Sequence, residues 1–451
     1  MNSPYPNRIP TPSKPSPSII RLKLLALSVP LSGVAWSRYQ NLLLLDAGYS
    51  VTSIGLFKTF GFIAKIIFSP VWGFVGDLTS PVLTLALSYI ISGLSLELVR
   101  QCLLQKWSFT VLLVIKTIRS ATNCISPVTE AVLYSATRNR TDNETYGKQR
   151  MLSSIAWGSG ALFVGFMIDK YGLYSVFNYT YFMCSLTLFL LYMLSKYDYG
   201  IIHGNQWEEK SDVEELRAIP VDNDDDKKKW TTQTTKTNKN TTTSASEVVK
   251  GLKELFLHPE LKRTACQIIV TGFVMTLVDV LLPLQLEQEF QTSRLFNGLT
   301  TWISILSSIP IYWCSQQLID RKGAFWMFRV AQSTYGVRLI GMVVLSLGNL
   351  ETTVQYVFLS LLQLLHGVTF ALVWIAATHK LQSFSSSKRK VTTSASTLVS
   401  TLYFTVGQGC GNIFWMYLYQ KYSNCALLYG IGWCILVLNR VALYFVNKVE
   451  I

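Results

Sequence analysis

The sequence predicts an all-α integral membrane protein with twelve transmembrane helices, arranged as two pseudo-symmetric six-helix bundles. Three observations predict this fold. Apolar residues make up 50% of the 451 residues and charged residues only 15%, which leaves too little polar surface to coat a soluble particle of this size. The apolar residues gather into twelve runs, each long enough to span a bilayer. A charged, Thr- and Asn-rich stretch separates the first six runs from the last six.

Each apolar run can cross a hydrocarbon core about 30 Å thick as a helix of roughly 20 residues. The first group occupies residues 22–45, 51–75, 82–104, 108–135, 151–169 and 174–196. The second group occupies residues 263–286, 295–319, 324–347, 354–379, 393–417 and 424–447. We therefore expect one six-helix bundle over residues 22–196 and a second over 256–451.

Two segments lack apolar periodicity. Residues 1–21 are rich in Pro and Ser and contain no acidic residue, and residues 197–255 include the run DNDDDKKKWTTQTTKTNKNTTTSASE. Such compositions cannot bury enough apolar surface to fold. We expect a disordered tail and a disordered linker.

The basic residues predict the orientation of the chain. They collect in the tail, in the linker and in loops on the same side of the predicted spans, and Arg150 is among them. The loops on the opposite side hold only Arg100, Lys106, Lys170, Arg294 and Lys421. Because cytoplasmic loops carry the excess of Lys and Arg, both termini are predicted to be cytoplasmic. The sequence leaves open whether the membrane is the plasma membrane or that of an organelle.

An internal repeat supports the two-bundle architecture. The second, fifth, eighth and eleventh runs end in GFVGDLTS, GFMIDKYG, QQLIDRKG and YLYQKYS. A unit of three helices therefore recurs four times, and successive copies are inverted in the membrane because three is odd. This arrangement is typical of transporters that rock two halves about a site at the bilayer midplane.

Several segments together carry a resemblance to a known family. They are IGLFKTFGFIAKIIFSPVWGFVGD (54–77), YGKQRMLSSIAWGSGALFVGFMIDKYG (146–172), LFLHPELKR and TLVDVLLPLQL (255–286), SSIPIYW (307–313) and LLHGVTFALVWIAA (364–377). The chain resembles the major facilitator superfamily, in the branch of lactose-permease-like and nucleoside:proton symporter-like transporters. The resemblance implies that the first, fourth, seventh and tenth helices line a central cavity.

The same resemblance implies a cytoplasmic gate. Gly73 and Asp77, and again Asp320, Arg321 and Gly323, resemble the loop signature in which an aspartate holds a neighbouring helix end and latches the inner gate. The sequence departs from the family at two places. Leu-Thr-Ser follows Asp77 where basic residues are expected, and Ser stands where an acidic residue is expected before the Ile-Pro of SSIP.

Ionisable groups inside apolar spans point to function, because each is costly unless it is paired or faces water. Lys116, Arg119, Asn123 and Glu130 are spaced so that they fall on one stripe of the fourth helix. We expect this stripe to face a water-filled cavity. A buried ladder of ion pairs with neighbouring helices is the alternative interpretation.

Alignment of LLLLD (42–46) with PLQLE (283–287) places Arg38 opposite Asp279, at equivalent positions of the first and seventh helices. Opposite charges at these positions predict a salt bridge that forms when the outer gate closes. Asp279 lies in a segment that resembles one with an acidic group in the family, so it is alternatively a group that binds substrate or a proton.

His366 lies deep in the tenth span, and an imidazole can exchange a proton near neutral pH. Arg338, in the ninth span, resembles a family arginine that modulates the protonation of a neighbour. Glu130, Asp279 and His366 are the candidates for proton coupling. Lys65, in the middle of the second helix, Gln363 and Trp374 complete the candidate set. Trp374, like Trp36, offers an aromatic face to a ring or simply packs between helices.

These observations predict a secondary transporter for a small polar solute such as a sugar, a nucleoside or an organic anion, coupled to protons and acting as a monomer in a lipid bilayer. If the candidate side chains point inward, Lys65, Arg38, Lys116, Arg119 and His366 outnumber Glu130 and Asp279 and leave the cavity positive overall. A positive cavity favours an anionic or multiply hydrogen-bonding solute. The sequence has no GxxxxGK[ST] motif and no nucleophile-base set, so we expect no enzyme activity. We expect no cofactor, no metal and no nucleic acid. A passive facilitator and a non-transporting receptor or scaffold on the same fold are the alternatives.

Overall fold

The computed structural model describes residues 17–137, 145–197, 258–288, 290, 294–348, 351–387 and 392–449. Most of the predicted tail and nearly all of the predicted linker therefore lie outside the described residues. The first helix begins at Pro17, a few residues before the predicted end of the tail.

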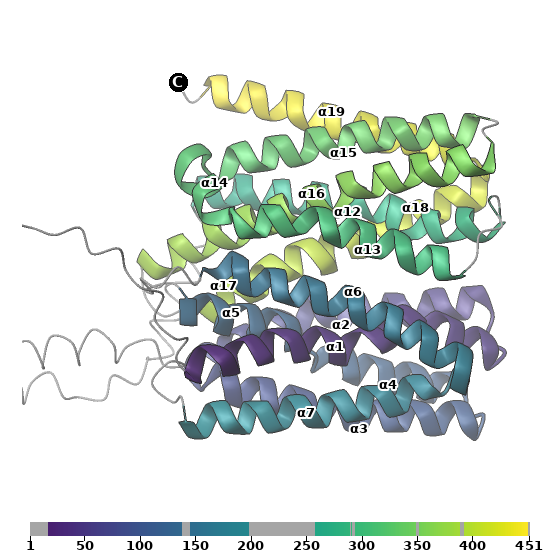
Figure 1. The fold of residues 1–451 in the computed structure, drawn as a ribbon, viewed down its shortest axis with the longest axis vertical. Helices are drawn as coiled ribbons and strands as arrows, with labels where there is room; N and C mark the ends of the chain where they lie inside the picture. Colours follow the sequence, from purple (N-terminus) through teal and green to yellow (C-terminus); the bar gives the residue numbers. More distant parts are fainter. Residues whose placement is uncertain are drawn as a thin grey trace, which may run out of the picture.

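The described chain is built of helices. The first half contains α1 (Pro17–Asp46), α2 (Val51–Leu78), α3 (Pro81–Leu104), α4 (Phe109–Ala121), α5 (Ile125–Thr137), α6 (Tyr146–Tyr171) and α7 (Ser175–Tyr197). The second half contains α12 (Pro259–Gln288), α13 (Arg294–Trp313), α14 (Ser315–Lys322), α15 (Ala324–Leu347), α16 (Thr352–Ser387), α17 (Thr392–Ser400), the π-helix η1 (Thr401–Gly407), α18 (Gln408–Tyr422) and α19 (Cys425–Val449). Figure 1 shows the two halves as neighbouring bundles of helices that run along one common direction.

The arrangement of the helices is consistent with the twelve predicted crossings. Nine helices of the described chain are long and apolar enough to span a membrane, namely α1, α2, α3, α6, α7, α12, α15, α16 and α19. The other three crossings are assembled from consecutive pieces: α4 with α5, α13 with α14, and α17 with η1 and α18. The predicted fold class is confirmed. Where single α-helices were expected, the fourth crossing is interrupted at residues 122–124 and the eighth at residue 314, and the eleventh contains a π-helical segment over Thr401–Gly407.

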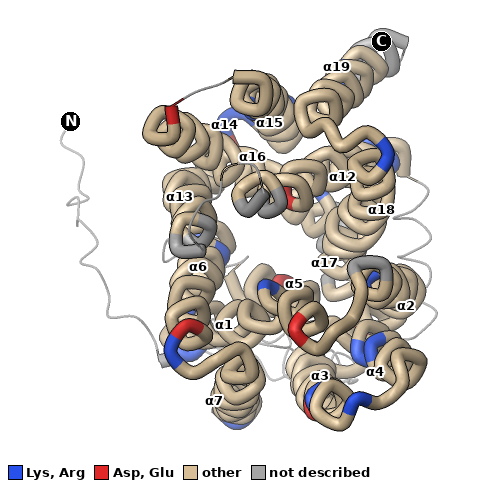
Figure 2. The backbone as a smooth tube through the Cα atoms, turned by 90° about the vertical axis from the view of Figure 1, so that its right-hand side faces the viewer, with Lys and Arg blue, Asp and Glu red and all other residues tan. Residues whose placement is uncertain are grey.

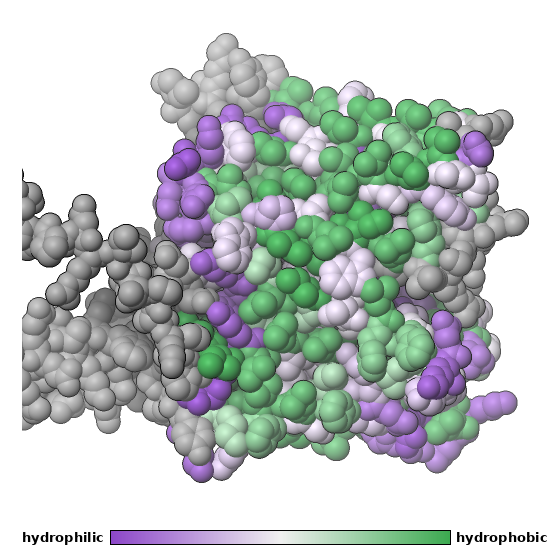
Figure 3. All heavy atoms as spheres, in the orientation of Figure 1, coloured by the Kyte–Doolittle hydropathy of each residue, from purple (hydrophilic) through white to green (hydrophobic). Residues whose placement is uncertain are grey.

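The surface of the bundle matches a bilayer. Large apolar side chains such as Leu94, Phe182 and Leu438 are 65%, 66% and 68% exposed. On the face drawn in Figure 3, hydrophobic residues cover the middle and hydrophilic residues gather toward the two ends. An apolar belt between polar ends is the surface expected of a membrane-embedded protein.

The two ends of the bundle need names. We call the end that carries Pro17, Tyr197 and Pro259 the linker end, on the left in Figure 1, and the opposite end the distal end. The predicted inversion of the repeats is visible here. Gly172 ends α6 at the distal end with φ of 82°, and Gly323 ends α14 at the linker end with φ of 77°. Both are positions in the left-handed region that favours glycine.

Each half has its own apolar core. One cluster of buried residues fills the second half, and two clusters fill the distal and linker ends of the first half. The halves meet where α13 packs on α6 and where α17 packs on α2 and α5. Figure 2, which looks along the helices from the distal end, shows the two halves side by side.

Candidate functional site

A cavity of about 620 Å³ lies between the two halves. Helices α1 to α7 contribute to its wall on one side, and α12, α13, α16, α17, η1 and α18 contribute on the other. Seven of the candidate residues line it: Lys65, Lys116, Arg119, Asn123, Glu130, Asp279 and His366. The structure thus brings charged groups from helices far apart in sequence into one polar space. Arg38, Arg338, Gln363 and Trp374 do not line it.

The fourth crossing is broken at the cavity. Residues 122–124 are not helical, so the prediction of one continuous helix is wrong, although all four residues of the predicted stripe line the cavity. Side chains from neighbouring helices satisfy the freed backbone: Trp72 Nε1 donates to the carbonyl of Ala121 at 2.7 Å, and Ser88 Oγ donates to that of Thr122 at 2.8 Å. Inside a membrane such partners are required, because no lipid can replace them. Asn123 lies within the break.

Three cations from α2 and α4 share one wall of the cavity. Arg119 donates to the backbone carbonyl of Ser92 and lies with its guanidinium carbon 5.2 Å from the centre of the Trp36 ring. The Nζ atom of Lys116 is 4.8 Å from the centre of the Phe57 ring. Lys65 lines the same space. The predicted cavity-facing cations of the second and fourth helices are therefore neighbours.

Glu130 is engaged in a network toward the linker end. Its carboxylate pairs with Arg150 at 3.2 Å and accepts a hydrogen bond from the Tyr146 hydroxyl. Tyr146 in turn accepts a hydrogen bond of 3.0 Å from Trp374 Nε1, on α16 of the other half. Trp374 is 1% exposed. It therefore packs between the halves rather than presenting a face to the cavity.

Arg150 is a site residue that the sequence interpretation missed. Its basic character and its position at the start of a span placed it with the topology-setting charges of the cytoplasmic loops. In the structure its side chain is 14% exposed, it lines the cavity, and its guanidinium carbon lies 5.2 Å from the centre of the Trp374 ring. The available signal was its spacing of four from Tyr146, which places both side chains on one face of α6.

The first loop signature joins the halves at the linker end. The Asp77 carboxylate accepts hydrogen bonds from the backbone N–H groups of Thr393 at 2.8 Å and Ser394 at 2.9 Å, in the first turn of α17. A carboxylate is stabilised at this place by the unpaired N–H groups and dipole of the helix. Gly73 allows the approach, because a Cβ there would lie 3.0 Å from the Cα of Ser394.

The second signature has different contacts. Asp320 accepts a hydrogen bond of 3.0 Å from Gln316, within α14. The N-terminus of α6, which faces this region, is capped by its own Thr145, whose side chain accepts from the N–H of Lys148. The linker-end contacts are thus asymmetric. Asp77 accepts hydrogen bonds across the interface from the other half, whereas Asp320 accepts one from within its own helix. Arg321 and Gly323 lie at the end of α14.

His366 connects the cavity to a buried polar chain. Its Nδ1 atom is 2.8 Å from a guanidinium nitrogen of Arg338, and Arg338 also donates to Gln363 at 3.1 Å. Arg338 is 1% exposed. Because a guanidinium has donors only, Nδ1 of His366 must accept, and the ring proton of the neutral imidazole lies on Nε2. The three candidates form one array in which only His366 lines the cavity.

Arg38 and Asp279 are not paired in this structure. Arg38 donates to the hydroxyl of Thr301, which lies on α13 in the other half. Asp279 accepts a hydrogen bond of 3.3 Å from Gln408. Among the described residues no ion pair joins the two, so the predicted salt bridge is absent from this conformation.

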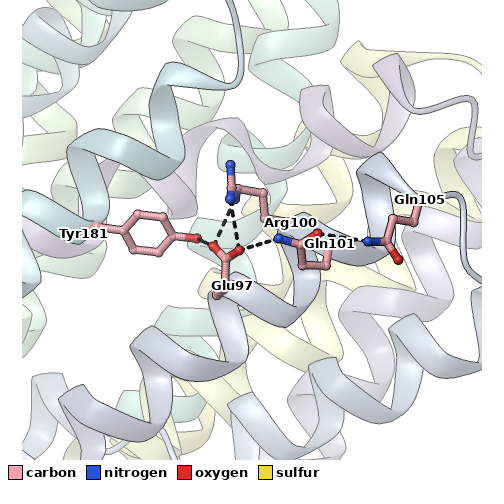
Figure 4. A network of polar contacts seen from close by, with 5 residues as sticks. All are labelled: Glu97, Arg100, Gln101, Gln105 and Tyr181. Carbon is pink, nitrogen blue, oxygen red and sulfur yellow. Dashed lines mark hydrogen bonds and ion pairs between the residues drawn. The ribbon is translucent and has the colours of Figure 1, made fainter.

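A second polar network lies away from the cavity, between α3 and α7 (Figure 4). Glu97 binds Arg100 through two hydrogen bonds of 2.9 and 3.0 Å and accepts one of 2.6 Å from Tyr181. Gln101 donates to the same carboxylate at 2.6 Å. Arg100, which was expected in a loop, is therefore within α3, and its contacts tie two helices of the first half together.

The comparisons with known proteins agree with this architecture. The model of the MFS_1 like family matches residues 34–431. A bacterial homologue of the iron transporter ferroportin in an outward-facing state is similar in structure, with a TM-score of 0.62, 13% identity, and coverage of 94% of this chain and 97% of that one. The nucleoside transporter NupG is similar with a TM-score of 0.61, 13% identity, and coverage of 96% and 99%. No curated protein matches the chain. At these identities the solved structures show the fold alone.

Proposed function

This chain belongs to the MFS_1 like family, and we propose that it moves a small polar organic solute across a membrane by alternating access. The resemblance and the fold make it a multi-pass membrane protein of the transporter type. The solute classes that we propose are a sugar, a nucleoside or an organic anion. The observation that carries the proposal is the polar cavity of about 620 Å³ between two helical halves, whose interface is bonded at one end.

The contacts at the linker end have the character of a gate. They are hydrogen bonds and close helix contacts between the halves, such as those of Asp77 with Thr393 and of Trp374 with Tyr146. Such contacts can break and reform without unfolding either core, because the buried residues of each core cluster all belong to one half. Rocking of two bundles about a shared site is the motion expected of this fold.

We propose that the linker end faces the cytosol, as the basic residues of the sequence indicate. The gate that is closed in this structure is then the cytoplasmic one. We also propose two bundles, over residues 22–196 and 256–451, joined by a disordered cytoplasmic linker, with the monomer as the transporting unit. The orientation is tested on sealed vesicles, by comparing how readily thiol reagents or proteases reach the linker from the outside and from the inside.

We propose proton coupling through His366 and Asp279. Both line the cavity, and neither forms an ion pair in the described part of the chain. Glu130, the third candidate, is held by Arg150 and Tyr146, which favours a part in the gate. Arg338 would act as a positioning residue, because it reaches the cavity only through His366.

Uptake into proteoliposomes tests the proposed function. Purified full-length protein is reconstituted and offered a panel of labelled sugars, nucleosides and organic anions, with and without a pH gradient. We expect concentrative uptake of one class that collapses when the gradient is abolished. Uptake that only equilibrates, with no response to the gradient, favours a passive facilitator. If no member of the panel enters above the level of empty liposomes, a receptor or scaffold role is favoured.

A further inference from the structure

One wall of the cavity carries three cations without a carboxylate beside them. Lys65 comes from α2, and Lys116 and Arg119 come from α4. The ion pairs found in the described chain are Glu97 with Arg100, Glu130 with Arg150, and Glu260 with Lys380. None involves these three cations. Lys65, Lys116 and Arg119 also lie close enough to repel one another.

The packing of the first half holds this arrangement in place. Gly61 of α2 leaves room for the Lys116 stem, because a Cβ there would lie 2.6 Å from the Lys116 Cε atom and 2.9 Å from Ser120 Oγ. Arg119 is fixed by the carbonyl of Ser92 and by Ser95 Oγ at 3.5 Å. These contacts orient the cations but do not neutralise them. The fold thus positions three cations that form no ion pair with any carboxylate of the described residues.

The cavity has two carboxylates, and neither serves these cations. Glu130 is neutralised by Arg150. Asp279 lies on α12 in the opposite half, where it accepts a hydrogen bond of 3.3 Å from Gln408. Clustered like charges in a space of low dielectric are costly unless an opposite charge joins them. An anion from outside the chain would supply the counter-charge that the described cavity residues do not provide.

We propose that Lys65, Lys116 and Arg119 form a subsite for a doubly charged oxyanion on the transported solute, either a phosphomonoester or a dicarboxylate. This deepens the proposed function and rests on it. A neutral solute leaves three charges unbalanced and a monoanion leaves two, whereas a dianion leaves one. The planar guanidinium of Arg119 can pair with two oxygens of one group, and each lysine supplies a point charge.

The rest of the cavity suits the organic part of such a solute. Trp36 and Trp157 line it from the first half, and Phe370, Tyr403 and Phe404 line it from the second. Aromatic side chains bury apolar surface and accept sugar or nucleobase rings on their faces. The volume of about 620 Å³ lies in the range of sites for small molecules. A solute bound with its charged end at the cations of the first half and its organic part toward the second half would bridge the two halves.

Binding to the purified full-length protein tests the subsite with matched pairs of ligands. The probes are glucose 6-phosphate against glucose, and succinate against monomethyl succinate, each titrated by thermal shift at low and high salt. We expect at least one dianion to bind about tenfold or more tighter than its matched partner, which corresponds to about 1.4 kcal/mol. The affinity should fall as salt is raised. Equal affinities within both pairs, or binding by neither dianion, would overturn the proposal.

Variants locate the subsite. Lys65→Gln, Lys116→Gln and Arg119→Gln should each weaken dianion binding by about 30-fold or more, because a buried charge pair is lost. Lys170→Gln is the control, since this lysine lies in the last turn of α6 at the distal end and does not line the cavity. Its effect should stay within about threefold, the size of a long-range electrostatic change. Lys116→Arg, which keeps the charge, should retain binding and reports on folding.

The proposal and the proposed function fail in different ways. If a neutral solute is taken up concentratively and all three glutamine variants leave this uptake unchanged, the subsite is contradicted and the proposed transport function is supported. The opposite outcome is dianion binding that the three variants abolish, with no exchange of the same ligand across the proteoliposome membrane. It would support the subsite and contradict the proposed transport function.

Discussion

The carboxylate of Asp77, in the last turn of α2, accepts a hydrogen bond of 2.8 Å from the backbone N–H of Thr393, in the first turn of α17. The two residues are separated by more than three hundred positions and belong to opposite halves. Opening of the linker end must break this bond and the one to Ser394. The strength of these two hydrogen bonds therefore contributes directly to the stability of the closed gate.

Replacement of Asp77 by asparagine should loosen the linker end. The amide keeps the size of the side chain, but it removes the charge and turns one acceptor into a donor that faces a backbone N–H. We expect a shift toward the open gate of about 1–3 kcal/mol. The measurement is maleimide labelling, from the linker side, of the cavity variant Ser126→Cys in a cysteine-free background, because Ser126 lines the cavity.

Asp320→Asn is the control for that experiment. Asp320 bonds Gln316 within its own helix, so its replacement should leave the labelling rate near that of the parent. Equal acceleration by both variants would show that the asymmetry of the two signatures has no consequence for the gate.

Glycine at position 147 should be required for closure. A Cβ there would lie 2.4 Å from the carbonyl oxygen of Tyr312 and 1.9 Å from Ser315 Oγ, in the other half. Gly147→Ala should therefore lower the melting temperature of the purified protein, with a loss of about 1–3 kcal/mol. Gly93→Ala is matched, since nothing lies within 4 Å of its Cβ. It should be neutral or stabilising by up to about 1 kcal/mol.

Removal of one partner from the Glu130–Arg150 pair should cost more than removal of both. Glu130→Gln leaves the guanidinium of Arg150 buried without a counter-charge, a change of about 3–5 kcal/mol. The double variant Glu130→Gln, Arg150→Gln leaves no such charge and should recover part of the loss. Thermal unfolding of the four proteins of this cycle measures the coupling. Strictly additive losses would show that the pair is not coupled.

Replacement of His366 by glutamine should separate proton coupling from exchange. We expect the variant to lose stimulation of uptake by a pH gradient while it retains counterflow of unlabelled against labelled solute. Arg338→Lys should shift the pH profile of uptake in the same assay, because lysine has one nitrogen and cannot reproduce the geometry in which two guanidinium nitrogens contact His366 and Gln363 separately. His379→Gln is the control, since His379 is on the same helix but does not line the cavity. A His366→Gln variant that still responds fully to the gradient would contradict the proposed coupling.

Composition and hydropathy were sufficient for the fold class. The twelve apolar runs correspond to the twelve crossings because the bilayer forces every spanning segment to be apolar and close to 20 residues long. The same reasoning missed the interruptions. The break at residues 122–124 follows from the side chains of Trp72 and Ser88, which supply hydrogen bonds from other helices. Hydropathy along a single segment holds no information about such partners.

The candidate site was predicted in part. Buried ionisable residues are rare enough that Lys65, Lys116 and Asp279 were identified from their places in apolar runs, and all three line the cavity. Arg150 was missed because the sequence pattern of a basic residue at the start of a span is the same whether its side chain faces bulk water or the cavity. The sequence also could not predict whether Asp320 contacts the other half, since that contact depends on how α14 packs against α6.

The interruption of the fourth crossing places its charged residues on two separate helices. The distal piece, α4, carries Lys116 and Arg119, while the other, α5, carries Glu130 and its bond to the gate network. Only residues 122–124 join them, and the hydrogen bonds of that joint come from Trp72 on α2 and Ser88 on α3. Strain imposed on one piece therefore reaches the other through a short hinge that two neighbouring helices brace, rather than along an unbroken rod.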